Sequence, residues 1–203
     1  MSLLADIIEL NTVELTRTAA HLRQNYIDKL GSEEIADRRF PIYDWQRLSL
    51  IYNRLHTGSQ SLEVGPGRGY FTTMLDREQK FEKNYAIDIV DLKQRLPSKV
   101  DFRIMNVTDL QFEDNSFDSV MCMEVLEHLS EVDFFKGLNE IRRVCKSQLI
   151  VSVPFNEPMP SKYHAQRFTV KKTLNWFPDG KYSILLKEPV MRVPWLMIEE
   201  NLS

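Results

Sequence analysis

The pattern of hydrophobic and polar positions divides the chain into an N-terminal part and a longer remainder. Over residues 3–30 apolar side chains recur at three- to four-residue spacing, which predicts an amphipathic helix that stops at Gly31. A second stretch of this kind, over residues 43–55, predicts another helix. We therefore expect an N-terminal helical arm or lid over residues 1–57 and a separate domain over residues 58–203.

Beyond residue 58, short apolar runs alternate with longer amphipathic ones, which is typical of strand–helix–strand units. Such units predict an α/β fold with a doubly wound, Rossmann-like sheet. The last two runs are separated by a short connection around Glu188-Pro189, which predicts an antiparallel hairpin. We expect a seven-stranded mixed sheet, with five parallel strands followed by this C-terminal hairpin. The predicted strands are 61–65, 84–88, 100–105, 117–123, 148–153, 181–187 and 190–198, and the predicted helices are 69–80, 91–96, 133–146 (capped by Asp133) and 169–177 (starting from Thr169).

Composition and charge narrow the class of protein. Apolar residues make up 43% of the chain and charged residues 27%, which is the profile of a soluble globular protein. The net charge of −3 gives no basic face, so we expect no general nucleic-acid binding. No run of 18 uncharged apolar residues predicts a membrane span, and MSLLADIIEL does not resemble a secretory signal. With Cys122 and Cys145 as reduced thiols, we expect a cytoplasmic protein, either a monomer or a homodimer.

The strongest local signal is the segment LEVGPGRGYF at residues 62–71. An apolar strand ends in Gly65, Gly67 and Gly69, and a helix follows, so a ligand can approach the backbone closely. Asp88 ends the next predicted strand, where a carboxylate can accept both hydroxyl groups of a ribose. The alternative is a purely structural turn. Tyr70 stands where a dinucleotide-binding loop has its third glycine, which disfavours a nicotinamide-dependent oxidoreductase.

These motifs, together with AID at the second strand, NVTDLQFEDNSFDSVMCMEVLEHL and VSVP, resemble class I S-adenosylmethionine-dependent methyltransferases of the ubiquinone-biosynthesis type. The resemblance covers about residues 58–190. It implies S-adenosylmethionine as the cofactor and S-adenosylhomocysteine as its product. Many relatives have an acid at the position of Asn106, where it binds the adenine amino group, and Asn106 can still accept from that group through its carbonyl oxygen. The implied contacts are Glu63, Gly65, Gly67 and Gly69 with the methionine moiety, Asp88 with the ribose, Ile89, Asn106 and Val107 with the adenine, and the carbonyl of Met123 with the ammonium.

Methyl transfer from a sulfonium is an in-line displacement, so the protein mainly supplies alignment and a dry pocket. If the acceptor must lose a proton, His128 or His164 is the candidate catalytic base. The predicted acceptor-binding segments are aromatic and carry few charges. They favour a small, partly apolar acceptor that is methylated on oxygen, nitrogen or carbon. The predicted substrate-pocket residues are Tyr43, Trp45, Phe155 and Tyr163, with Phe40 and Met159 nearby.

Glu124, Glu127 and His128 share one face if their segment is helical, and His164 could add a fourth ligand for a divalent cation. This pattern is similar to the metal site of ubiquinone-type O-methyltransferases and of small-RNA 3′-end methyltransferases. It leaves open a metal-dependent O-methyltransferase that acts on a catechol, a diol or an RNA 3′-end ribose. Many relatives that bind no metal have the same residues in this segment, EVLEHL, so we expect no metal ion in this protein. A non-catalytic nucleoside-binding module is the remaining alternative.

Overall fold

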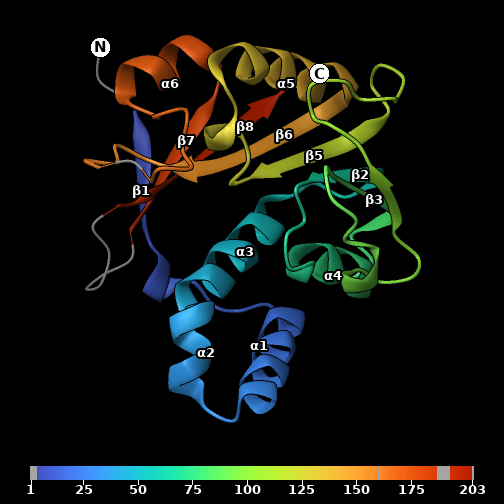
Figure 1. Cartoon of the computed structure of the whole chain (residues 1–203), viewed down its shortest axis with the longest axis vertical. Helices are drawn as coiled ribbons and strands as arrows, with labels where there is room; N and C mark the ends of the chain where they lie inside the picture. Colours follow the sequence, from blue (N-terminus) through green and yellow to red (C-terminus); the bar gives the residue numbers. More distant parts are fainter. Residues whose placement is uncertain (1–3, 160, 187–192, 203) are drawn as a thin grey trace.

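The computed structural model describes residues 4–159, 161–186 and 193–202. Within these residues one sheet has eight strands, in the order β1-β7-β8-β6-β5-β2-β3-β4 (Figure 1). Strands β2 to β6 run parallel, and β8 lies antiparallel between β6 and β7. The predicted doubly wound sheet with a C-terminal antiparallel hairpin is therefore confirmed. The strands are β1 (Ala5–Glu9), β2 (Gly58–Val64), β3 (Phe81–Asp88), β4 (Asp101–Ile104), β5 (Phe117–Met123), β6 (Cys145–Pro154), β7 (Lys181–Leu186) and β8 (Trp195–Asn201).

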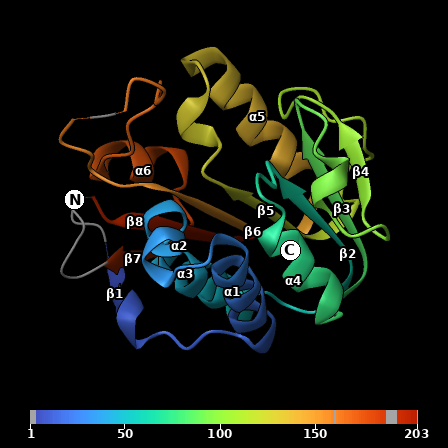
Figure 2. The same cartoon turned by 60° about the horizontal axis from the view of Figure 1, so that its bottom comes forward.

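Helices cover both faces of this sheet. Figure 1 shows α5 and α6 on one side, while α1 to α4 lie on the other side, as the turned view of Figure 2 also shows. No helix among the described residues is long and apolar enough to cross a membrane. The helices are α1 (Arg17–Leu30), α2 (Glu33–Arg39), α3 (Ile42–Arg54), α4 (Tyr70–Arg77), α5 (Glu131–Val144) and α6 (Val170–Trp176), and the 3-10 turns are η1 (Leu10–Thr12), η2 (Lys93–Arg95) and η3 (Leu126–His128).

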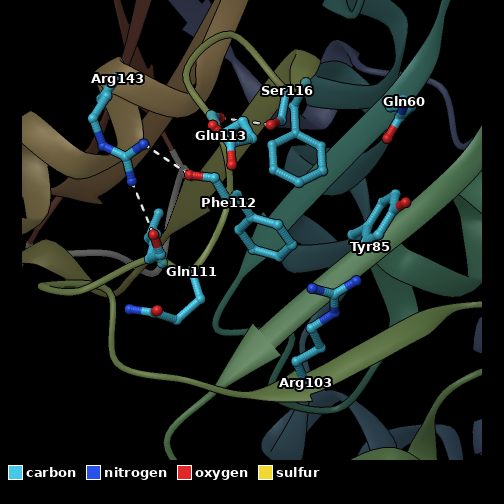
Figure 3. Close-up of a pocket in the computed structure, with 10 residues that line it drawn as sticks. Gln60, Tyr85, Arg103, Gln111, Phe112, Glu113, Ser116 and Arg143 are labelled. Carbon is cyan, nitrogen blue, oxygen red and sulfur yellow. Dashed lines mark hydrogen bonds between the residues drawn. The ribbon is translucent and has the colours of Figure 1, made fainter.

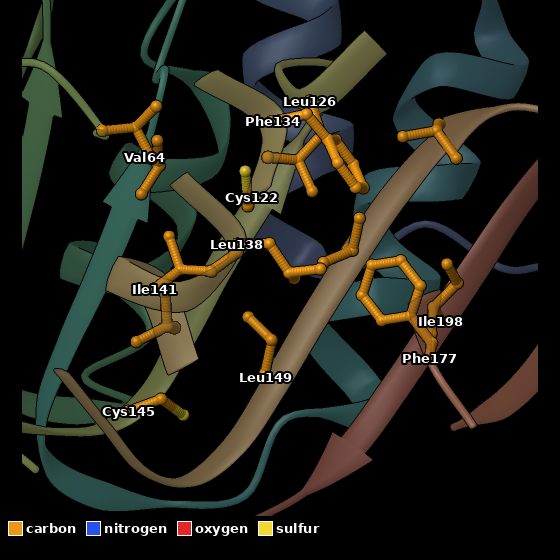
Figure 4. Packing of buried hydrophobic residues seen from close by; sticks show 14 of the residues in the cluster. Val64, Cys122, Leu126, Phe134, Leu138, Ile141, Cys145, Leu149, Phe177 and Ile198 are labelled. Atoms are coloured by element: carbon orange, nitrogen blue, oxygen red, sulfur yellow. The ribbon is translucent and has the colours of Figure 1, made fainter. Parts of the chain in front are cut away.

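Side chains that alternate along the buried strands fill two separate cores. Val120 and Cys122 of β5 belong to the core beneath α5 and α6, part of which Figure 4 shows. Their neighbours Met121 and Met123 belong to the core on the opposite face, beneath α1, α3 and α4. Successive strand side chains point to opposite faces of a sheet, so a strand covered on both sides is apolar at nearly every position.

The expected helix over residues 3–30 is wrong in its first part. Residues 5–9 form β1, which pairs in parallel with β7 and adds an eighth strand to the sheet. Helix α1 begins only at Arg17, after Thr16, whose side chain accepts a hydrogen bond from the Ala19 amide. The open edge of β7 offers backbone partners, and this tertiary pairing overrides the local helical spacing.

Three further boundaries differ from the prediction. The expected helix over 91–96 is reduced to η2, because it is short and the residue before Pro97 disfavours helical backbone. Helix α5 is capped by Ser130 rather than Asp133, which lies in its first turn. Strand β8 begins at Trp195 instead of residue 190, and residues 190–192 of the expected strand lie outside the described residues. Thr169 caps α6 as predicted.

Leu10 anchors β1 to the rest of the molecule, and its side chain is fully buried in the core beneath α1, α3 and α4. We expect Leu10→Ala to lower the free energy of unfolding by about 2–5 kcal/mol, because it leaves a cavity in a packed core. Leu4→Ala is the matched control, since Leu4 is 88% exposed and its truncation should cost no more than about 0.5 kcal/mol. Urea denaturation of both variants measures the difference. Equal losses would contradict the packing of residues 5–12 against the sheet.

Candidate functional site

The loop between β2 and α4 crosses the carboxyl edge of the sheet at its switch point, between β3 and β5. Gly65, Gly67 and Gly69 all have left-handed backbone, with φ angles of 72°, 51° and 75°. A Cβ at position 65 would lie 2.5 Å from Val125, and one at position 69 would lie 2.7 Å from the carbonyl oxygen of Arg95. A Cβ at Gly67 would meet no atom within 4 Å. Gly65 and Gly69 thus allow the loop to pack, whereas Gly67 faces open space.

A cavity of about 450 Å³ opens beside this loop. Its walls come from the ends of β2, β3, β4 and β5, where parallel strands bring their following loops together. The cavity has an apolar side, formed by Ile89, Met105 and Leu129 among others, and a polar side. Six predicted cofactor-binding residues line it, namely Gly65, Gly67, Asp88, Ile89, Asn106 and Val107.

The polar side chains of the cavity are held by local turns. Asp88 Oδ1 accepts a hydrogen bond from the Val90 amide at 3.2 Å. Asn106 Oδ1 accepts two hydrogen bonds of 3.0 Å from Thr108, one from its amide and one from its hydroxyl. Because these bonds occupy the carbonyl oxygen of Asn106, its amide NH₂ group is the part left to meet a ligand. Asn106 is therefore a hydrogen-bond donor here, whereas the sequence suggested its carbonyl oxygen as an acceptor.

The other three predicted cofactor-binding residues do not line this cavity. Met123 packs its side chain in the core beneath α3, and Gly69 forms the start of α4. Glu63 is buried under the loop, where it accepts a hydrogen bond from the Thr72 hydroxyl. Burial raises the pKa of Glu63 to about 7, although the Thr72 hydrogen bond opposes this. Glu63 thus joins β2 to α4 from below the loop.

The N-terminal helices contact the glycine loop directly. Arg68 donates a hydrogen bond of 2.7 Å to the Tyr26 hydroxyl and another to the Arg39 carbonyl oxygen. The Tyr70 ring packs against the Trp45 ring, with 4.6 Å between their centroids. The loop is therefore fixed on its outer side by residues of the arm.

The predicted substrate-pocket residues do not come together at the cavity. Trp45 is fully buried among aromatic rings of the arm, and Phe155 is buried in the core beneath α6. Tyr43 lies beside the Trp195 ring, and Tyr163 is an exposed loop residue. Of the two nearby residues, Phe40 packs against Trp45, whereas Met159 is exposed. Aromatic residues were expected to line a pocket, but burial of large apolar surface directs several of them into cores instead.

Glu124 reaches the cavity from the end of β5, but its carboxylate is already engaged. Oε1 accepts hydrogen bonds from Arg47 at 2.9 Å and Ser152 at 3.2 Å, and Oε2 accepts one from the Trp195 indole at 3.0 Å. Arg47 is itself buried and stacks on the Trp195 ring. Glu124 therefore ties α3 to β6 and β8, and both of its oxygens have protein partners.

Glu127, His128 and His164 form a second cluster beside the cavity. One metal-binding atom from each lies within 4.8 Å of the others. Glu127 is almost completely buried, and its Oε2 has no hydrogen-bond partner among the described residues. Burial, reinforced by the nearby Glu124, raises the pKa of the Glu127 carboxyl. His128 also lines the cavity, so it connects the cluster to the cavity.

The comparisons with known proteins agree with this geometry. Residues 62–151 match the model of a methyltransferase domain family. This part of the chain is therefore similar to methyltransferase domains. An uncharacterised protein of Methanocaldococcus jannaschii is 33% identical over 134 residues, and the ubiquinone biosynthesis O-methyltransferase of Agrobacterium fabrum is 27% identical over 132 residues. These matches cover 65% and 62% of this chain, and the chain spans about half the length of each relative, 52% in both cases.

A solved structure has a similar fold over most of this chain. It is the 1,6-didemethyltoxoflavin-N1-methyltransferase of Burkholderia thailandensis, with bound 1,6-didemethyltoxoflavin and S-adenosylhomocysteine. It aligns with a TM-score of 0.63 and 20% identity, over 93% of this chain and 92% of that one. At this level of identity the likeness concerns the fold alone.

A second, larger cavity of about 570 Å³ is drawn in Figure 3, and none of the residues of the glycine loop line it. It opens among Tyr85, Arg103, Phe112 and Arg143. Arg143 donates to Glu140, to Asp114 and to the carbonyl oxygens of residues 110 and 112, so its guanidinium holds the loop before β5. This cavity contains none of the predicted site residues.

The sequence pattern did not indicate three residues of the site, Arg47, Arg68 and Glu157. Arg47 and Arg68 look like ordinary surface charges of a helix and a loop, and Glu157 lies in an irregular segment. Glu157 accepts a 2.8 Å hydrogen bond from Nδ1 of His164. Arg47 and Glu157 are buried whereas Arg68 is exposed, and the local sequence pattern indicates none of their hydrogen-bond partners. Only the surrounding structure identifies these three.

The raised pKa of Glu63 predicts how the free energy of unfolding depends on pH. In the unfolded chain Glu63 titrates near 4.5 and in the folded chain near 7. Its contribution to stability is therefore complete below pH 4.5 and is lost as the pH rises through 7, a loss on the order of 3 kcal/mol. Glu63→Gln removes the ionisation, so the variant should gain this amount relative to wild type between pH 4.5 and pH 8.

Urea denaturation at several pH values measures the difference in unfolding free energy between Glu63→Gln and wild type. The change of this difference with pH does not depend on any destabilisation by the new amide that is the same at every pH. The exposed Glu82, replaced by Gln, serves as the control and should show no such gain. A stability difference between Glu63→Gln and wild type that stays constant with pH would contradict the buried carboxyl.

Proposed function

We propose that this chain transfers the methyl group of S-adenosylmethionine to oxygen, nitrogen or carbon of a small, partly apolar acceptor. The observation that carries the proposal is the single cavity that brings together the open side of Gly67, the carboxylate of Asp88 and the side chain of Asn106. The methyltransferase-domain match over residues 62–151 contains all three residues.

The residues of this chain fit the cofactor in three respects. The space beside Gly67 would be filled by any side chain, so glycine leaves room for a ligand against the backbone. Asp88 has one oxygen, Oδ2, without a hydrogen-bond partner among the described residues, and it could accept from ribose hydroxyls. Ile89 is 70% exposed at the cavity wall, where an adenine ring would cover it.

When bound, S-adenosylmethionine supplies an electrophilic methyl group on a positively charged sulfur. The chain's own task is to hold the two reactants in line and to exclude water. Asp88 and the glycine loop bind and orient the donor, and Asn106 donates to an acceptor atom of the base. His128 also lines the cavity, where it would take a proton from an acceptor that must lose one.

Asp88→Ala should weaken binding of S-adenosylhomocysteine by more than about tenfold, because it removes a charge-assisted pair of hydrogen bonds to the ribose. Isothermal titration calorimetry measures the change. Asp91→Ala is the matched control, since Asp91 lies three residues further on and does not line the cavity. Unchanged affinity in Asp88→Ala would reject the assignment of the donor site.

A second function, metal-assisted O-methylation, is favoured by one specific observation. The Glu127 cluster contains two imidazole rings and a buried carboxylate oxygen that has no hydrogen-bond partner within residues 4–159, 161–186 and 193–202. This donor set suits a divalent transition metal. Glu127, His128 and His164 would hold the ion, which would lower the pKa of an acceptor hydroxyl. Glu124 does not fit the set as a ligand, because Arg47, Ser152 and Trp195 use both of its oxygens.

If this second function holds, Mn²⁺ or Zn²⁺ titrated into the protein should bind at one site and EDTA should abolish methyl transfer. Glu127→Gln should weaken metal binding by about tenfold or more, because it removes the buried ligand. Glu124→Gln is the matched control and should change metal affinity by no more than about twofold, since it lies outside the ligand set. Methyl transfer that persists in EDTA would reject the metal-assisted function and leave the donor site intact.

A further inference from the structure

The segment that follows β6 is attached firmly to the turn that carries His128. The backbone amide of Gln166 donates a hydrogen bond to the Glu127 carbonyl oxygen at 2.9 Å. The side-chain Nε2 of Gln166 donates another to the Leu129 carbonyl oxygen at 3.1 Å. Gln166 is buried, and Phe155 and Phe168 close the segment by a backbone bridge. The two loops therefore form one unit.

Within this unit each of the two histidine rings, His128 and His164, is held by a hydrogen bond at its Nδ1 nitrogen. His128 Nδ1 lies 2.9 Å from the carbonyl oxygen of Tyr163, and His164 Nδ1 lies 2.8 Å from Oε2 of Glu157. A carbonyl or carboxylate oxygen can only accept, so each Nδ1 must carry the proton. In a neutral ring the lone pair then resides on Nε2. The centroids of the two rings are 5.1 Å apart.

The partners of the two rings differ in kind. His128 is held by backbone, which no substitution removes, whereas His164 depends on the side chain of Glu157. That carboxylate is buried, with 8% of the residue exposed, and lies outside the donor cavity. An ionised carboxylate at Nδ1 orients an imidazole and makes its other nitrogen a better base or metal ligand.

We propose that Glu157 is a positioning residue of this site, which fixes His164 in its Nδ1-protonated form and leaves Nε2 free to act as a base or a ligand. The proposal deepens the proposed function, because it names the group that prepares His164. It applies to a metal-free site and to a metal-bound site alike.

Long-range ¹H–¹⁵N correlation spectra of the whole ¹⁵N-labelled chain, at a pH where the rings are neutral, report which nitrogen of each histidine is protonated. Wild type should show His128 and His164 protonated at Nδ1, with His21 and His56 as internal references. In Glu157→Leu, His164 should change to the Nε2-protonated form while His128 stays as it is. Glu157→Gln should weaken the preference for Nδ1 protonation, because an amide can either accept from a protonated Nδ1 or donate to an unprotonated one.

A His164 ring protonated at Nε2 in wild type, or one unchanged in Glu157→Leu, would overturn the proposal. Binding of S-adenosylhomocysteine should differ by no more than about twofold between Glu157→Leu and wild type, which shows that the variant is folded. If Glu157→Leu does not fold, the wild-type spectrum still decides, because a His164 ring protonated at Nε2 in wild type overturns the proposal.

Titration with Zn²⁺ separates this proposal from the metal-assisted function. If the ion binds wild type, Glu157→Leu should weaken it by about 10- to 100-fold, and Lys162→Ala in the same loop should not. Unchanged affinity in Glu157→Leu would count against the positioning role. If wild type binds no Zn²⁺, the metal-assisted function fails, and the spectra still decide the role of Glu157.

Discussion

The chain leaves β2 and enters α4 through a turn of five residues, and the rest of the site depends on that turn. Its three glycines adopt left-handed backbone, which costs other residues steric energy. Gly65 and Gly69 are also in contact with the loops that follow β5 and β3, with no room for a Cβ. The turn therefore packs these loops against itself and leaves its one open position, Gly67, facing the cavity. A rigid loop with one open side is what a ligand needs in order to approach the main chain.

Features that depend on local chemistry could be predicted from the sequence. The glycine turn, the apolar parallel strands and the short hairpin connection each carry their own signal, so the order of the elements was predictable. Asp88 and Asn106 follow neighbouring strands, and parallel strands bring such residues to one edge. The predictions that were wrong concern residues whose structure depends on distant partners. Residues 5–9 form a strand only because β7 offers an edge, and Trp45 is buried only because Phe40 and Tyr70 surround it.

Three glutamates near the cavity show how surroundings give one side chain different chemistry. Glu124 forms an ion pair with the buried guanidinium of Arg47, with 2.9 Å between Nη1 and Oε1. Glu63 meets only a hydroxyl, and burial brings its pKa to about 7. Glu127 has one oxygen with no hydrogen-bond partner in the part of the chain that the structure describes, so a proton or a cation would complement its charge. The left-handed backbone of Glu124, with φ of 56°, is unusual for a residue with a side chain, and its three hydrogen-bond partners hold it there.

The two sides of the cavity come from different parts of the chain. All the residues that hold the donor in the proposed function lie within residues 62–151, the part that matches the methyltransferase domain family. Arg47 precedes this part, and Glu157 and His164 follow it, yet they reach the same cavity or its neighbouring cluster. The family match therefore covers the proposed donor side of the cavity, whereas Arg47, Glu157 and His164 lie outside the matched residues. Arg47 reaches the cavity only through its contact with Glu124, and the segment after β6 reaches it through its contact with His128. In the proposed function these two segments would therefore influence the choice of acceptor while the donor side stays the same.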